Sequence, residues 1–191
     1  MPRFSKGELE SYRDAVVPDL LPGPGQPLKL LFVGINPGLW TAAVQTHFAR
    51  PGNRFYPALL EAGIIDRPIS PAEGMTEADR DYFRARGIGI TNVVRRATAR
   101  ADELSPDELR EGGRLLVQTV EQTRPRVVAL AGITAYRAAF GRPKAVLGRQ
   151  EETLGGAELW VAPNPSGLNA HDTVATLATA YAAAARAAGV I

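Results

Sequence analysis

Three short apolar runs constrain the fold of this chain more than any other feature. They cover residues 28–34, 126–132 and 158–164, and a fourth candidate strand, 88–94, runs into a loop. The three runs are almost continuous in apolar side chains, which is typical of strands covered on both faces. Because helical patterns separate the strands, the sequence predicts an α/β fold: a single three-layer domain with a short, mostly parallel central sheet flanked by helices.

The helical segments carry their own start and stop signals. In the clearest of them, 105–125, Ser105 is the expected N-cap, Pro106 the first helical residue and Glu108 the second half of a capping box. The other predicted helices cover residues 6–15, 53–63, 76–87, 133–140 and 172–188. Proline and glycine in "PGPGQP" (22–27) forbid regular structure, so we expect an N-terminal extension and linker over 1–27 and the domain over 28–191.

Composition narrows the chemistry. The chain has no cysteine, which excludes disulfides, thiolate zinc sites and iron–sulfur clusters, and its two histidines are far apart in sequence. We therefore expect no metal and no cofactor. The N-terminus lacks the apolar stretch of a signal peptide, and no apolar run approaches membrane length, so we expect a cytoplasmic protein without membrane contact.

Arginine dominates the basic residues. Only three of the 22 basic residues are lysine (Lys6, Lys29 and Lys144), so nineteen are arginine. The planar guanidinium binds phosphates and base edges better than an ammonium group does. A compositional bias of the genome explains the same count equally well.

Asparagine recurs where the predicted strands end. The first strand ends in "GINPG" (34–38), the strand at 158–164 leads into "NPSGLNAH" (164–171), and Asn92 ends the strand between them. In open α/β sheets ligands lie outside the carboxyl ends of the strands, so these loops are the expected site. Asn-Pro alone is a common turn, but two such turns and a third asparagine at neighbouring strand ends exceed ordinary turn chemistry.

Several familiar sites are excluded. No GxGxxG follows the first strand, and the chain has no phosphate-binding GK[ST]. The strand ends offer amides rather than the carboxylate pair of a typical glycosidase.

At these residues the chain resembles the mismatch-specific uracil / thymine DNA glycosylase family, a branch of the uracil-DNA glycosylase superfamily. "GINPG" is similar to the first motif of that family and "NPSGL" to the second. The likeness continues through "HFARPGNRFYPALLEAGI" and "GITNVVRRATARADELSPDELREGG" and covers roughly residue 28 to the end.

The resemblance implies a DNA repair hydrolase of base excision repair, acting as a monomer on double-stranded DNA. Such an enzyme flips uracil, and in some members thymine or ethenocytosine, out of a G·U- or G·T-type mismatch. It then hydrolyses the glycosidic bond and leaves an abasic site. The resemblance further implies a monofunctional enzyme, in which water attacks and no lysine forms a Schiff base.

The resemblance also assigns the base pocket. Asn36 is the implied catalytic residue, which positions water and contacts the base. The pocket would be built from Gly34, Ile35, Asn36, Pro37, Gly38, Thr41, Phe48, Asn92 and Asn164, with Phe48 stacked on the flipped base. Plain structural roles stay open: a core ring for Phe48, a helix cap for Thr41, a strand-end cap for Asn92 and a turn for Asn36.

DNA contacts are assigned to two further segments. Leu168 would fill the hole left by the flipped nucleotide, while neighbours in the loop meet the orphaned guanine. That loop comprises Pro165, Ser166, Gly167, Leu168 and Asn169. Arg95, Arg96 and Arg100 form the candidate backbone contact, although a solvated loop explains them equally well. Some relatives carry arginine where this chain has Ala170. His171 would take over that phosphate or groove contact, unless it is an ordinary surface histidine.

Two other functions stay in play. One is a mismatch or nucleic-acid binder without catalysis on the same scaffold, against which the intact Asn36 argues. The other is a nucleotide-handling α/β enzyme, which should carry a phosphate loop or a metal-binding carboxylate cluster; the sequence shows neither.

Overall fold

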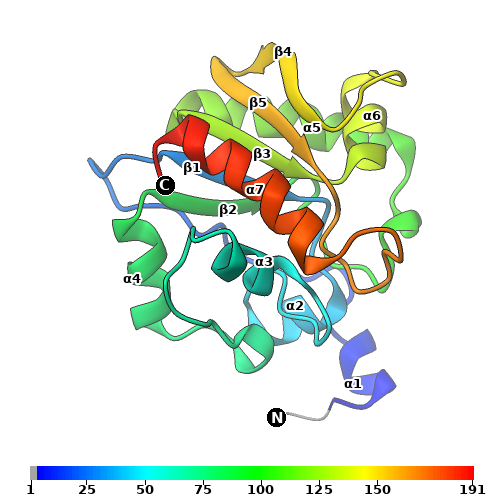
Figure 1. Cartoon of the computed structure of the whole chain (residues 1–191). Coiled ribbons are helices and arrows are strands. Elements are labelled where there is room, and N and C mark those ends of the chain that lie inside the picture. Colours follow the sequence, from blue (N-terminus) through cyan, green and yellow to red (C-terminus); the bar gives the residue numbers. More distant parts are fainter. Residues whose placement is uncertain (1–3) are drawn as a thin grey trace.

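The computed structural model describes residues 4–191, and its centre is a five-stranded sheet with the order β2–β1–β3–β5–β4 (Figure 1). Four strands are parallel: β1 (Leu30–Gly34), β2 (Ile88–Asn92), β3 (Val127–Ala131) and β5 (Ala157–Ala162). Strand β4 (Gly148–Leu154) is antiparallel to β5. The α-helices are α1 (Lys6–Glu10), α2 (Leu39–Val44), α3 (Phe55–Glu61), α4 (Glu77–Ala85), α5 (Pro106–Thr123), α6 (Ile133–Phe140) and α7 (Val174–Ala188).

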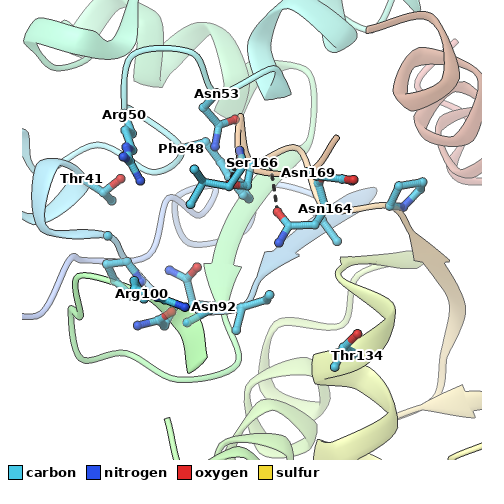
Figure 2. A pocket seen from close by; sticks show the side chains of 18 of the residues that line it. Thr41, Phe48, Arg50, Asn53, Asn92, Arg100, Thr134, Asn164, Ser166 and Asn169 are labelled. Carbon is cyan, nitrogen blue, oxygen red and sulfur yellow. Dashed lines mark hydrogen bonds between the residues drawn. The ribbon is translucent and has the colours of Figure 1, made fainter. Parts of the chain in front are cut away.

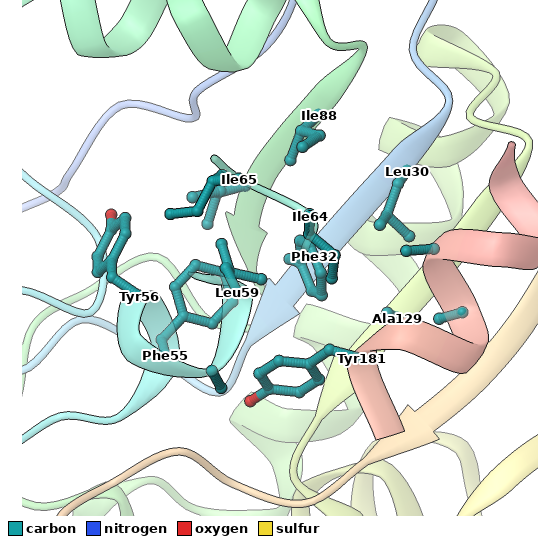
Figure 3. Packing of buried hydrophobic residues seen from close by; sticks show 14 of the residues in the cluster. Leu30, Phe32, Phe55, Tyr56, Leu59, Ile64, Ile65, Ile88, Ala129 and Tyr181 are labelled. Atoms are coloured by element: carbon teal, nitrogen blue, oxygen red, sulfur yellow. The ribbon is translucent and has the colours of Figure 1, made fainter. Parts of the chain in front are cut away.

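Helices cover both faces of the sheet. Leu30 and Phe32 of β1 pack into a core with α3 and α7, including Phe55 and Tyr181 (Figure 3). Leu31 and Val33 point into a second core with α5 and α6. All of β1 is therefore buried, which explains why its sequence does not alternate. The predicted three-layer α/β fold is confirmed.

The predicted helix over 6–15 is too long. Ser5 caps α1 with Glu8 as the capping-box partner, but the helix ends at Glu10. Asp14 adopts a left-handed φ of 63°, and its N–H donates to the carbonyl of Ala97 at 2.9 Å. A tertiary backbone hydrogen bond thus replaces the next helical turn.

One strand and one α-helix were not predicted. Strand β4 alternates between half-buried and exposed polar residues, so it lacks the apolar run that marks a buried strand. Helix α2 is only six residues long and follows directly from the "GINPG" turn. The other predicted helices and strands are confirmed, each within a few residues of its predicted ends.

Part of the predicted N-terminal extension packs on the domain. Val17 and Leu20 are buried. The N–H of Leu20 donates to the carbonyl of Ile90 at 2.9 Å, and the N–H of Ile90 donates back at 2.8 Å. The boundary at residue 27 stays a prediction, but residues 14–20 lie against β2 and the loop that follows it.

Gly112 lets α5 approach the end of β2. A Cβ on Gly112 would lie 2.4 Å from the carbonyl oxygen of Val93, whereas one on Gly7 in α1 would meet nothing within 4 Å. We expect Gly112→Ala to lower the free energy of unfolding by about 1–3 kcal/mol, because this overlap outweighs the helix propensity of alanine. Gly7→Ala is the matched control and should be neutral or slightly stabilising in denaturant melts. Equal stability of the two variants would contradict the close approach.

Candidate active site

A cavity of about 610 Å³ opens at the carboxyl ends of the parallel strands. Loops after β1, β2, β3 and β5 all contribute to its wall (Figure 2). Most of the residues predicted for the site line it: Ile35, Asn36, Pro37, Gly38, Thr41, Phe48, Asn92, Arg100, Asn164, Ser166, Leu168, Asn169 and His171. Five predicted residues lie outside the lining: Gly34, Arg95, Arg96, Pro165 and Gly167.

The amide of Asn36 has one defined orientation. Its Nδ2 donates to the carbonyl of Arg96 at 3.1 Å and to Oγ1 of Thr98 at 2.8 Å. The Thr98 hydroxyl donates its own hydrogen to the carbonyl of Arg100, so it can only accept from Asn36. Both Nδ2 hydrogens are thus used. Among residues 4–191, Oδ1 has no hydrogen-bond partner and is not sealed from solvent, so it is an open acceptor in the cavity wall.

Asn92 is held by a buried histidine. His47 is 5% exposed, and its Nε2 lies 2.9 Å from the carbonyl of Pro18. A carbonyl only accepts, so Nε2 carries the hydrogen and Nδ1 is left to accept from Nδ2 of Asn92 at 3.1 Å. The predicted strand-end asparagine therefore lies in the cavity wall with its amide oriented from behind.

Burial lowers the pKa of His47 below the usual 6.5, because desolvation disfavours the imidazolium; Arg80 acts in the same direction, while Pro18 and Asp19 oppose it. Below about pH 6.5 the unfolded chain binds a proton here that the folded chain does not. We expect the free energy of unfolding to fall as the pH is lowered through that value. His47→Gln should make the free energy of unfolding depend less on pH. Denaturant melts between about pH 7.5 and 5.5 measure it; identical slopes would show that His47 ionises equally in both states.

Phe48 lines the cavity. Its ring stacks on Phe55 with ring centres 4.1 Å apart and planes 25° apart. Its φ of 56° is unusual for a non-glycine residue and costs on the order of 1–3 kcal/mol. Gly34 packs behind this ring: an added Cβ would lie 3.1 Å from Phe48 and 2.5 Å from Oδ1 of Asn92. Gly34 thus makes room for two wall residues rather than lining the cavity itself.

A single arginine holds the loop over residues 164–172. The Arg54 guanidinium donates to the carbonyls of Ser166 at 2.6 Å, Asn169 at 2.5 Å and Asp172. Within the loop, Asn164 Oδ1 accepts from the N–H of Ser166 at 3.0 Å (Figure 2). This arrangement fixes the loop that carries Leu168, whose side chain is 72% exposed.

The three predicted backbone-binding arginines already have carboxylate partners. Arg95 pairs with Asp19 at 3.0 Å, and Arg100 pairs with Asp102. Arg96 binds Glu108 through two nitrogens and Asp14 through a third, and it lowers the pKa of Glu108 to about 2. Phosphate contact by these arginines stays a prediction, and Arg96 is the least free of them.

Several residues that line the cavity were not predicted from the sequence. Asp102 and Asp172 line the cavity, so the strand ends do not offer amides alone. Both carboxylates are engaged: Asp102 by Arg100, and Asp172 by Asn169 at 2.7 Å. Arg50 also lines the cavity, is exposed, and has no carboxylate partner within residues 4–191. Exposed Leu147, from the loop before β4, lies in the same wall.

Within residues 4–191, no group of three or more histidine, cysteine, aspartate or glutamate side chains lies close enough to hold a metal ion. In the same residues, none of the helices has the length and apolar character needed to span a bilayer.

The architecture defines the class of the protein. It is similar to the solution structure of a protein from Methanosarcina acetivorans that is provisionally described as a uracil DNA glycosylase, with a TM-score of 0.60 and 17% sequence identity. The similarity covers 91% of this chain and 98% of that one. The fold is therefore that of a uracil-DNA-glycosylase-like α/β domain.

The family follows from the sequence match. The family model described as the uracil DNA glycosylase superfamily matches residues 22–185. The chain belongs to the uracil DNA glycosylase superfamily. Its match begins inside the predicted linker, at Pro22.

Proposed function

We propose that the protein is a monofunctional DNA glycosylase that excises uracil from G·U-type mismatches in double-stranded DNA, with thymine and ethenocytosine opposite guanine as further candidate bases. Membership of the superfamily supports the reaction. The observation that carries the proposal for this chain is the Asn36 amide, whose hydrogens are both used by the protein and whose oxygen is open to the cavity.

The chemistry suits an amide rather than a strong base. The glycosidic bond breaks toward an oxocarbenium-like sugar and a uracil anion, so the enzyme needs to stabilise charge and place a water. Oδ1 of Asn36 can accept a hydrogen bond from that water and orient its lone pair toward the sugar. An amide does not ionise near neutral pH, so we expect slower turnover than a carboxylate at this position would give.

Base recognition would use other residues of the cavity wall. The ring of Phe48, which lines the cavity, offers a stacking surface worth about 1–3 kcal/mol per base in other proteins. The exposed Leu168, on a loop held by Arg54, suits insertion into the stack after the base has left it. Arg50, exposed and without a carboxylate partner in the described residues, is a better candidate than Arg96 for a nearby phosphate.

The test is direct. The protein is incubated with end-labelled duplexes containing G·U, G·T or G·ethenocytosine and with an A·U duplex and single-stranded uracil DNA, and abasic sites are then cleaved with alkali. We expect alkali-dependent cleavage at uracil opposite guanine, faster than opposite adenine, and equal rates with and without EDTA. Binding to mismatches without any cleavage would favour the non-catalytic binder instead. The monomeric state and the cytoplasmic location remain predictions.

A further inference from the structure

We propose that His47, held by the carbonyl of Pro18, is a positioning residue that fixes the Asn92 amide with its oxygen as the acceptor offered to the bound base. The N-terminal segment would thereby set which hydrogen-bonding edge of a base the cavity takes. This inference rests on the proposed function and adds a residue and a segment to it.

The Pro18 carbonyl sets which groups donate and which accept in the two hydrogen bonds that join Asn92, His47 and Pro18. Pro18 supplies a carbonyl, which cannot donate, so the hydrogen lies on Nε2 of His47. Nδ1 then has only a lone pair, and Nδ2 of Asn92 must donate to it. Oδ1 of Asn92 has no partner among residues 4–191 and is not sealed from solvent. It is therefore the acceptor that a bound base can meet.

The segment around Pro18 is itself held against the sheet. Leu20, two residues after Pro18, exchanges two backbone hydrogen bonds with Ile90 of β2. Asp19 accepts from the Thr91 hydroxyl at 2.7 Å and from Arg95 at 3.0 Å. The carbonyl of Pro18 thus has a fixed position relative to the strand that ends in Asn92.

An acceptor at Asn92 selects for a base that presents a ring N–H. Uracil and thymine carry this hydrogen on N3, whereas N3 of cytosine is itself an acceptor and would face Oδ1 without a hydrogen between them. The hydrogen-bond relay from Pro18 through His47 to Asn92 therefore favours a base with an imide N–H. Without the hydrogen bond from His47, the Asn92 amide could rotate by half a turn and present its donors to the base, and the preference would weaken.

Two substitutions of His47 separate its hydrogen bond to Pro18 from its hydrogen bond to Asn92. His47→Gln can keep a donor near Nε2 for Pro18 but removes the acceptor at Nδ1. His47→Asn can place its own Oδ1 where Nδ1 stood, so it keeps the acceptor for Asn92 while losing the bond to Pro18. If positioning of Asn92 is what matters, His47→Asn should behave like the wild type and His47→Gln should not.

The experiment is single-turnover excision of uracil opposite guanine. We expect His47→Gln to be slower by about fivefold, as for loss of one neutral hydrogen bond, and His47→Asn to stay within about twofold of the wild type. Asn92→Ala should also be slower, and adding His47→Gln to it should slow it no further, because the amide that His47 orients is gone. If His47→Gln slows Asn92→Ala as much as it slows the wild type, His47 acts as scaffold and the proposal is overturned.

A second measurement does not depend on activity or on the variants folding. Long-range ¹H–¹⁵N correlation spectra of the ¹⁵N-histidine-labelled wild type report which ring nitrogen of His47 carries the hydrogen. We expect the neutral ring with hydrogen on Nε2 at neutral pH; hydrogen on Nδ1 would overturn the relay. If the wild type excises no base, the proposed function fails, while this spectrum still decides the orientation of the histidine.

Discussion

Replacing Asn36 by alanine should slow uracil excision by about a hundredfold or more, comparable to the loss of one positioned polar group at a reacting centre. Affinity for the same DNA should hardly change, because the substitution removes no charge. The physical reason is the fixed amide: with both hydrogens donated to the protein, Oδ1 is the atom that can hold the attacking water. Single-turnover cleavage and filter binding on one G·U duplex measure the two quantities. Turnover like that of the wild type would make Asn36 a turn residue.

Thr98→Val provides a graded control for that result. It keeps Asn36 but removes one of the two acceptors that orient its amide, at 2.8 Å. We expect a loss of several-fold, between the wild type and Asn36→Ala, because the Arg96 carbonyl still holds the other hydrogen. A Thr98→Val variant as slow as Asn36→Ala would point to collapse of the loop rather than loss of the amide. Thermal melts of both variants check that they are folded.

Leu168→Ala should slow excision from a mismatched duplex by roughly tenfold while leaving single-stranded DNA nearly unaffected. In a duplex, apolar contact with neighbouring bases offsets part of the unstacking cost, and truncation deletes most of that contact. At about 25 cal/mol per Å² the loss is on the order of 1–2 kcal/mol in the flipped state. Excision of one uracil oligonucleotide, alone and annealed opposite guanine, makes the comparison.

The matched control for the Leu168 substitution is Leu60→Ala. Leu60 is also an exposed leucine, on α3, but it does not line the cavity. We expect it to leave both rates unchanged. Equal slowing of duplex and single strand by Leu168→Ala would assign Leu168 to the scaffold. Asn36→Ala, in contrast, should depress both substrates alike, since hydrolysis follows flipping.

The sheet could be predicted because each core strand has a recognisable apolar run in its own sequence. Strands β1 and β3 are buried on both faces and so are continuous in apolar residues, and α5 carries a complete capping box at Ser105. Strand β4 could not be predicted. It lies at the edge of the sheet and is only partly buried, so its sequence is largely polar and resembles that of a loop.

The loops of the site were predictable, but their supports were not. Asn36 stands out because of the motif around it, yet its partner Thr98 lies 62 positions away, and no local pattern marks that residue. Arg54 is separated from the carbonyls it holds by more than 110 residues. The pairing of Arg96 with Glu108 was missed for the same reason: a cluster of basic residues in sequence says nothing about the acids that the fold brings to it.

The way the two sheet edges are finished bears on how the chain behaves at high concentration. An open strand edge is a template on which a second molecule can add its own strand and begin to aggregate. At β2 the hydrogen bonds between Leu20 and Ile90 occupy part of that template. At β4 the outer strand carries exposed Arg149 and Glu151, and its pairing with β5 shifts register between Arg149 and Thr153. Charge and irregularity both oppose edge-to-edge addition, so the fold resists self-association through its sheet.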